Sequence, residues 1–239
     1  MTAPVSAAPV PIWEDFLEIF YAPRAVFTRR ATSGFWLPLL IMFAVSIALF
    51  FGGRGLLQPM YDAEFDRAMA VQQRQNPAMT QEQVDKGRQI ATKFTTVIIP
   101  VVLLVAPLVI GFFLWIAGKF VGARQELEAA CMVAVYAMFP RVLEGLTNLL
   151  QAAVVSADTL TSRYALQLGP ARFIDPDAHF VLLTILGRFD LITLWCTGLL
   201  ALGLSVTGKI ELKKALIGAG IVWLLPGLWG VWGAVRAAG

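Results

Sequence analysis

The stretch FYAPRAVFTRRATSGFWLPLLIMFAVSIALFF, residues 20–51, joins an aromatic and basic segment to a long uncharged run, and this run decides the fold. No charged side chain occurs between Arg30 and Arg54. A helix needs about 20 apolar residues to cross roughly 30 Å of hydrocarbon. The run is long enough to cross a membrane, so we expect a transmembrane helix at residues 35–53.

The composition of the whole chain is typical of an integral membrane protein. Of its 239 residues, 58% are hydrophobic and 15% are charged, whereas soluble domains have roughly 45–50% apolar and 25% charged residues. The mean hydropathy is +0.70. The formal net charge of +3 is small for this length, so no nucleic-acid partner is expected. Cys131 and Cys196 lie in apolar runs, and we interpret them as packing residues.

Apolar windows recur along the chain and predict five membrane-spanning helices. They lie at residues 35–53, 94–117, 129–155, 179–206 and 215–235. These runs are continuous and do not alternate with a period of two, so they indicate helices and not the strands of a barrel. The predicted fold is an all-α membrane protein. An N-terminal segment at 1–34 precedes the five-span domain at 35–235, which contains a polar loop at 54–93.

The loop at residues 54–93 is the only sizeable polar region. Its two halves have helical character and are separated by Asn76 and Pro77. Thr80 and Gln83 have the spacing of a capping box at the start of the second helix. We therefore expect a helical hairpin outside the bilayer, with a solvated face that could also dock a partner.

Basic residues near the spans predict the orientation, because they favour the cytoplasmic side. With a cytoplasmic N-terminus, eight basic residues of short segments lie inside and three outside. The inner set is Arg24, Arg29, Arg30, Lys119, Arg124, Lys209, Lys213 and Lys214, and the outer set is Arg163, Arg172 and Arg236. The polar loop would add six basic residues outside, accompanied by five acids. After five spans the C-terminus is then expected outside, and no cleavable signal peptide is expected.

The segment before the first span has the pattern of an interfacial amphipathic helix. Trp13, Phe16 and Phe20 recur at helical spacing, and Glu14, Asp15 and Glu18 are expected on the opposite side. Pro23 then ends or bends the helix. Arg24, Arg29 and Arg30 are expected at the depth of lipid headgroups. The segment is interpreted as an orientation anchor, or alternatively as an element that binds a partner or senses lipid.

Charged residues inside the third and fourth spans are the most specific signal of the sequence. Such groups are costly in a membrane, and they usually pair or line a polar cavity. The cluster is Arg141, Glu144, Asn148, Arg188 and Asp190. Counted from the predicted cytoplasmic ends, its four charges lie roughly 18–27 Å deep. Pairing of Arg141 with Asp190 and of Glu144 with Arg188 is therefore possible, either as a structural lock or as part of a polar pathway.

Two separate stretches resemble the Yip family, the Ypt/Rab-interacting membrane proteins, in its bacterial form. They are FYAPRAVF with FWLPLLIM, at residues 20–27 and 35–42, and RFDLITLWCTGLLALGLSVTGKIELKKALIGAGIVWLL, at residues 188–225. The resemblance implies five spans and a cytosolic N-terminus. Eukaryotic relatives bind prenylated Rab GTPases and act in vesicle traffic. Their Asp-Leu-Tyr-Gly-Pro motif does not occur in this sequence, so the resemblance gives no support for Rab binding here.

The sequence carries none of the common catalytic motifs, and it has one histidine. We therefore expect no enzyme activity, no metal site and no cofactor. The function that fits best is a membrane scaffold or adaptor, with membrane organisation as one such role, and the alternative is a small transporter, channel or lipid-handling protein that uses the charged cluster. The expected partners are membrane lipids, with a protein partner or a second copy as further candidates. The expected location is the bacterial cytoplasmic membrane.

Overall fold

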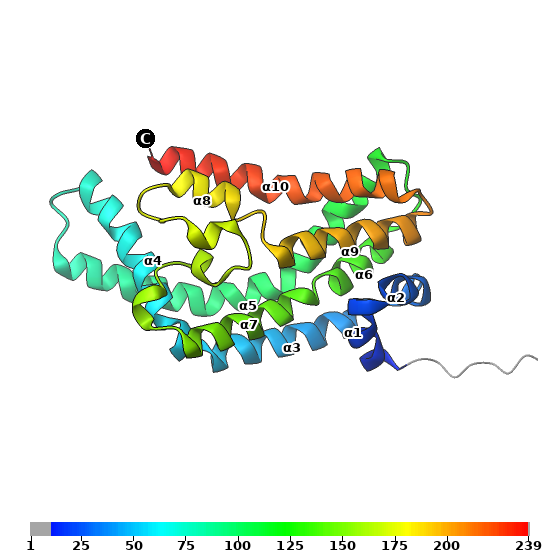
Figure 1. Cartoon of the computed structure of the whole chain (residues 1–239), viewed down its shortest axis with the longest axis horizontal. Helices are drawn as coiled ribbons and strands as arrows, with labels where there is room; N and C mark the ends of the chain where they lie inside the picture. Colours follow the sequence, from blue (N-terminus) through cyan, green and yellow to red (C-terminus); the bar gives the residue numbers. More distant parts are fainter. Residues whose placement is uncertain (1–10, 239) are drawn as a thin grey trace, which may run out of the picture.

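The computed structural model describes residues 11–238, with side chains to Val235, and these residues form helices and no strand (Figure 1). The α-helices are α1 Ile12–Tyr21, α2 Pro23–Arg30, α3 Trp36–Gly52, α4 Arg54–Gln75, α5 Gln81–Phe120, α6 Leu127–Ala137, α7 Pro140–Val154, α8 Phe180–Leu186, α9 Leu191–Gly208 and α10 Leu212–Ala238. Short 3-10 turns lie between α7 and α8: η1 Ala157–Thr159, η2 Arg163–Leu166 and η3 Pro170–Phe173.

Four helical segments of the described chain are long and apolar enough to cross a membrane. They are α5, the unit of α6 and α7 at Leu127–Val154, α9, and α10 as far as Val235. Helix α3 has 17 residues, which is about 25 Å at 1.5 Å per residue. It qualifies as a fifth span only together with α4, from which it is bent by 74°. The all-α membrane fold is thus confirmed, with four to five spans.

Helix α6 is the centre of the bundle. Every residue from Ala130 to Ala137 is at most 7% exposed, and α5 and α9 both pack against the helix. The backbones of α5 and α6 come close together at Gly111, where a Cβ would lie 2.7 Å from the Cα of Cys131. Tyr136 is 1% exposed and is among the largest fully buried side chains of the described residues. Helix α6 therefore belongs to the buried hydrophobic core of the bundle.

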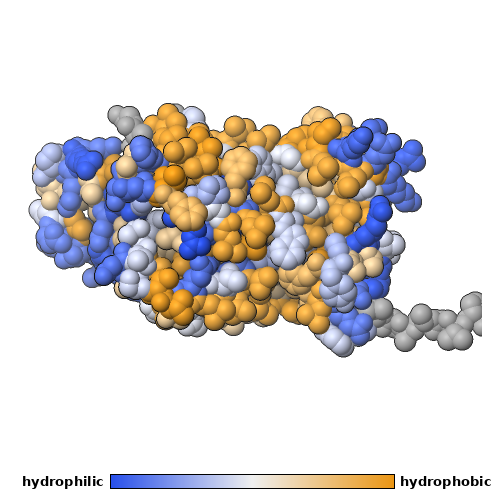
Figure 2. All heavy atoms as spheres, in the orientation of Figure 1, coloured by the Kyte–Doolittle hydropathy of each residue, from blue (hydrophilic) through white to orange (hydrophobic). Residues whose placement is uncertain are grey.

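The outer helices turn apolar side chains outward. Figure 2 shows hydrophobic residues over the middle of the visible face, with hydrophilic residues at the two ends. Large exposed apolar residues include Val97, Val101, Val105 and Val109 of α5, and Ile217, Leu228 and Trp229 of α10. An exposed apolar surface of this extent is not stable in water. It suits contact with lipid chains.

The polar loop contains the two predicted helices. Helix α4 ends at Gln75, and α5 begins at Gln81 with the predicted capping box of Thr80 and Gln83. Arg88 of α5 pairs with Asp62 of α4 at 2.8 Å. Helix α5 has 40 residues, about 60 Å, so it continues from this hairpin into the bundle without a break. That the hairpin lies outside the bilayer remains a prediction.

Ion pairs tie this hairpin to the loop after α7. Arg163 donates to both carboxylate oxygens of Glu64 at 2.9 Å, and Arg67 donates to Asp177 at 2.6 Å. Hydrogen bonds to Glu64 raise the pKa of the Arg163 guanidinium above its ordinary value. The hairpin is thus anchored to the same end of the bundle as α8.

The fourth predicted span is not one helix, which corrects the expected continuous helix at 179–206. Helix α8 ends at Leu186, and α9 starts at Leu191. The loop before α8 enters the gap, where the Leu191 N–H donates to the Leu168 carbonyl at 3.1 Å. A Cβ at Gly169 would lie 2.9 Å from the Phe189 carbonyl oxygen. The Leu191 N–H thus bonds to a carbonyl of the loop and not to a carbonyl of α8, so the helical hydrogen bonds do not continue from α8 into α9.

Candidate functional site

Asp190 lies at the break between α8 and α9, where it caps α9. It is 1% exposed. One carboxylate oxygen accepts from the Thr193 N–H at 3.0 Å and from the Thr193 hydroxyl at 3.2 Å. The other accepts from the Leu168 N–H at 3.0 Å. Backbone donors therefore stabilise this buried charge, and the carboxylate fastens the loop to the start of α9.

Arg141 of α7 approaches the same point without touching Asp190. It donates to Glu144 at 2.7 Å and to the Thr193 hydroxyl at 2.8 Å. The predicted direct pair of Arg141 with Asp190 is therefore wrong, because Thr193 stands between the two charges and bonds to both. Arg141 takes its anion from its own helix, three residues further along. Half-buried Asn148 joins none of these hydrogen bonds among the described residues.

Arg188 is separate from this network. Its guanidinium donates to the Trp223 carbonyl of α10 and lies 5.3 Å from the centre of the Trp223 ring. The predicted pair of Arg188 with Glu144 is not formed, and no described carboxylate pairs with Arg188. Pro226 has no N–H and loosens the carbonyl ladder of α10 at this level. Gly227 leaves room, since a Cβ there would lie 3.3 Å from the Arg188 Nε.

The sequence interpretation missed Thr193 and the loop at 167–169. The Thr193 signal was present, since Asp190 precedes an apolar run and stands three residues before a residue that its side chain can cap. The loop had no signal, because its contact is made by backbone groups that any sequence possesses. The two halves of the cluster are thus a bridge through Thr193 and a separate arginine against α10.

A second polar centre lies under the N-terminal helices. Asp15 of α1 is fully buried. It accepts from Arg30 at 2.6 Å, from Arg29 at 3.1 Å and from the Tyr136 hydroxyl at 3.2 Å. Glu18 also accepts from Arg29. The expectation that Asp15 lies on the side of α1 opposite Phe16 and Phe20 is wrong, because Asp15 is buried in the protein, where Phe16 also packs. Two arginines and a tyrosine compensate its burial, so the hairpin of α1 and α2 is fixed to α6.

The aromatic residues of α1 pack inward as well. Phe16 stacks on Phe139 at 4.5 Å, and Phe20 meets Trp195 edge to face at 5.5 Å. Phe27 of α2 is fully buried. Figure 1 shows α1 and α2 beside the start of α3, at the end of the bundle opposite the C-terminus.

The six residues predicted to face the membrane interface therefore divide into groups. Phe16 and Phe20 pack in the protein, and Arg29 and Arg30 pair with acids of α1. Trp13 and Arg24 are exposed. The six do not form one surface. A role of the exposed pair in binding lipid stays a prediction.

The family model of the Yip1 domain matches residues 17–234, nearly the whole chain. No curated protein and no solved structure shows a significant match. The matched range contains α2 to α9 in full, the second half of α1 and most of α10. Together with the apolar helices, it identifies the chain as an integral membrane protein that belongs to the Yip1 domain family.

Proposed function

We propose that this protein is a non-enzymatic membrane scaffold or adaptor. The observation that carries the proposal is the buried centre of the bundle, where eight consecutive residues of α6 are at most 7% exposed. The charged side chains of the membrane-spanning part stabilise contacts between segments of the protein. Asp190 holds a loop to α9, and Thr193 joins Asp190 to Arg141.

Four cavities of the described residues lie away from these charges. One lies under the polar hairpin, two border α8, and one lies beside α2. None of the four is lined by Arg141, Glu144, Arg188 or Asp190. This arrangement favours a structural role for the charges over a route for ions or lipid headgroups.

The N-terminal hairpin supplies a surface for a partner. Trp13, Leu17 and Tyr21 of α1 are 59%, 60% and 75% exposed, while the other side of the hairpin is fixed by Asp15. A rigid element with exposed aromatic residues loses little conformational entropy on binding, and aromatic residues are enriched at protein interfaces. With the N-terminus in the cytoplasm of a bacterial cell, this surface would face a cytoplasmic partner or a second copy.

Site-specific photo-crosslinking in native membranes tests the adaptor role. A photoreactive residue at Tyr21 should give one discrete protein adduct. The same residue at Phe173, which is 83% exposed and lies in η3, outside the N-terminal hairpin of α1 and α2, is the matched control and should not give that adduct. Lipid adducts alone at Tyr21, or the same protein adducts at both positions, would contradict an adaptor surface on α1.

A further inference from the structure

A cavity of about 290 Å³ lies at the base of the polar hairpin, where α4 leaves α3 and passes α5. Its apolar wall includes Phe50 from the last turn of α3. Its polar wall includes Arg54 at the start of α4 and three hydroxyl side chains, Tyr61, Thr92 and Thr95. Arg88 and Arg163 complete the basic side, with Asp62 and Glu64 as the acids.

Each acid of the wall is already occupied by a partner. Glu64 accepts two side-chain hydrogen bonds from Arg163 at 2.9 Å. Asp62 accepts from Arg88 at 2.8 Å. Among the described residues, the side chain of Arg54 makes neither an ion pair nor a hydrogen bond, although it is half-buried. Arg54 is therefore the cation of this cavity that lacks an anion.

The hydroxyl groups of the wall are free to donate. None of the hydroxyls of Tyr61, Thr92 and Thr95 bonds to a described residue. Burial, and next the charge of Glu64, raise the pKa of Tyr61. Its phenol thus keeps its proton at neutral pH. One unpaired guanidinium with three nearby O–H donors is the chemistry that recognises a phosphate group.

The cavity lies where the chain changes from polar to apolar. The uncharged part of α5 begins after Lys93, so Thr92 and Thr95 stand on the two sides of this boundary. Beyond it, Phe94 and Val97 are 65% and 67% exposed. A ligand here would have its phosphate against Arg54 and an acyl chain along α5. A free phosphate would leave the apolar part of the wall without a partner.

We propose that this cavity binds the phosphate of an anionic phospholipid, with Arg54 as the cation and Tyr61, Thr92 and Thr95 as hydroxyl donors. One cation remains after the ion pairs of the wall are counted. A lipid with one net negative charge, such as phosphatidylglycerol, therefore fits better than zwitterionic phosphatidylcholine. The proposal does not depend on the scaffold role.

The test is a lipid titration of the purified full-length protein in mild detergent, followed by its thermal unfolding. Phosphatidylglycerol should raise the midpoint temperature of unfolding at a lower lipid concentration than phosphatidylcholine does. Arg54→Gln should weaken the apparent affinity for phosphatidylglycerol about fivefold, the effect of one arginine near an anionic lipid. Arg54→Lys should keep most of the response, and it also shows that the site tolerates substitution.

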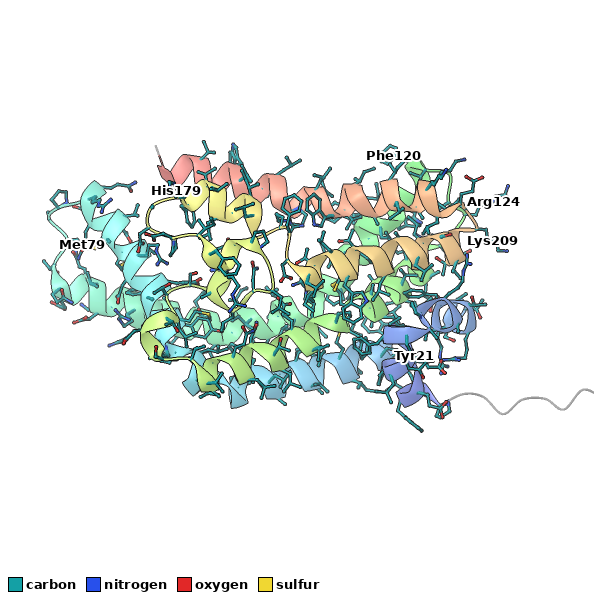
Figure 3. All side chains as sticks on the ribbon, in the orientation of Figure 1. Tyr21, Met79, Phe120, Arg124, His179 and Lys209 are labelled. Atoms are coloured by element: carbon teal, nitrogen blue, oxygen red, sulfur yellow. The ribbon has the colours of Figure 1, made fainter. Side chains whose placement is uncertain are left out.

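Arg124→Gln is the matched control, because Arg124 is exposed at the opposite end of the bundle (Figure 3). It removes the same charge and should respond as the parent does. Inorganic phosphate should not reproduce the effect. An equal response to both lipids, an Arg54→Gln variant that responds like the parent, or full stabilisation by inorganic phosphate would each overturn the proposal.

Discussion

At the scale of single residues, two buried carboxylates bind separate segments of this protein together. Asp15 and Asp190 are both at most 1% exposed. Asp15 joins α1 to the next helix, α2, and to the distant α6, and Asp190 joins the loop at 167–169 to α9. A buried charge is strongly destabilising when its partners are removed. Loss of a partner should therefore be measurable at both sites.

Asp15→Asn should lower the free energy of unfolding by about 3–5 kcal/mol, because it leaves the Arg29 and Arg30 charges without their shared carboxylate. Tyr136→Phe removes one hydrogen bond to Asp15 and should cost about 1 kcal/mol. In the Asp15→Asn background, Tyr136→Phe should cost less, because its acceptor is already altered. Thermal unfolding of the two single variants and the double variant measures the coupling. Strictly additive losses would contradict the contact.

Thr193→Val tests the bridge between Arg141 and Asp190. The variant keeps the shape of the side chain and removes the hydroxyl that bonds to both charged groups. We therefore expect the free energy of unfolding to fall by about 1–3 kcal/mol. Thr197→Val is the control, since the Thr197 hydroxyl bonds only to a carbonyl of its own helix, at 2.8 Å. Equal shifts in unfolding temperature for the two variants would show that the Thr193 bridge is not stabilising.

At the scale of helices, the sequence was sufficient for the all-α class, and insufficient for the break in the fourth predicted span and for the contacts between helices. Charge-free windows are a local property, so the all-α class and the capping box at Thr80 could be predicted. The rotation of each helix about its axis depends on its neighbours. This is why Asp15 was expected opposite the aromatic residues of α1, although it is buried against Tyr136. It is also why a pair of Arg188 with Glu144 was considered possible, although Arg188 lies against α10.

The close approach of α5 and α6 can be tested through Gly111. Gly111→Ala places a methyl group 2.7 Å from the Cα of Cys131. The backbone of Cys131 cannot move away as a side chain can, so we expect the free energy of unfolding to fall by about 1–3 kcal/mol. Gly198→Ala in α9 meets no atom within 4 Å, and it should be neutral or slightly stabilising. Comparing their unfolding temperatures checks the packing, and a tolerated Gly111→Ala would contradict it.

At the scale of the whole molecule, the short basic turns counted as cytoplasmic lie at one end, while the polar hairpin carries six basic residues at the other end. Arg124 and Lys209 lie together, with the Arg124 N–H bonded to the Gly208 carbonyl at 3.1 Å. Figure 3 shows them at the end opposite Met79 and His179. The C-terminus lies towards that opposite end in Figure 1. The proposed orientation, in which the end with Arg124 and Lys209 faces the cytoplasm, rests on the basic residues of the short turns, because long loops weigh less in this rule.

Reporter fusions check this orientation. A reporter in the turn between α5 and α6, at residues 119–124, should report the cytoplasmic side. A reporter after Gly239 should report the outer side, because the basic turns favour retention inside. Membrane fractionation serves as the control, because the protein with the insertion in this turn must still be found in the membrane. Reversed labelling at both positions would overturn the orientation and leave the fold intact.

The most direct test of the scaffold account is flux across vesicles that contain the purified parent protein. The buried α6 core and the fastened charges predict ion leakage and lipid exchange at the rates of protein-free vesicles. Asp190→Asn should lower thermal stability without creating flux. Ion or lipid transport by the parent above the protein-free rate, and its loss in Asp190→Asn, would contradict the account and support a transporter.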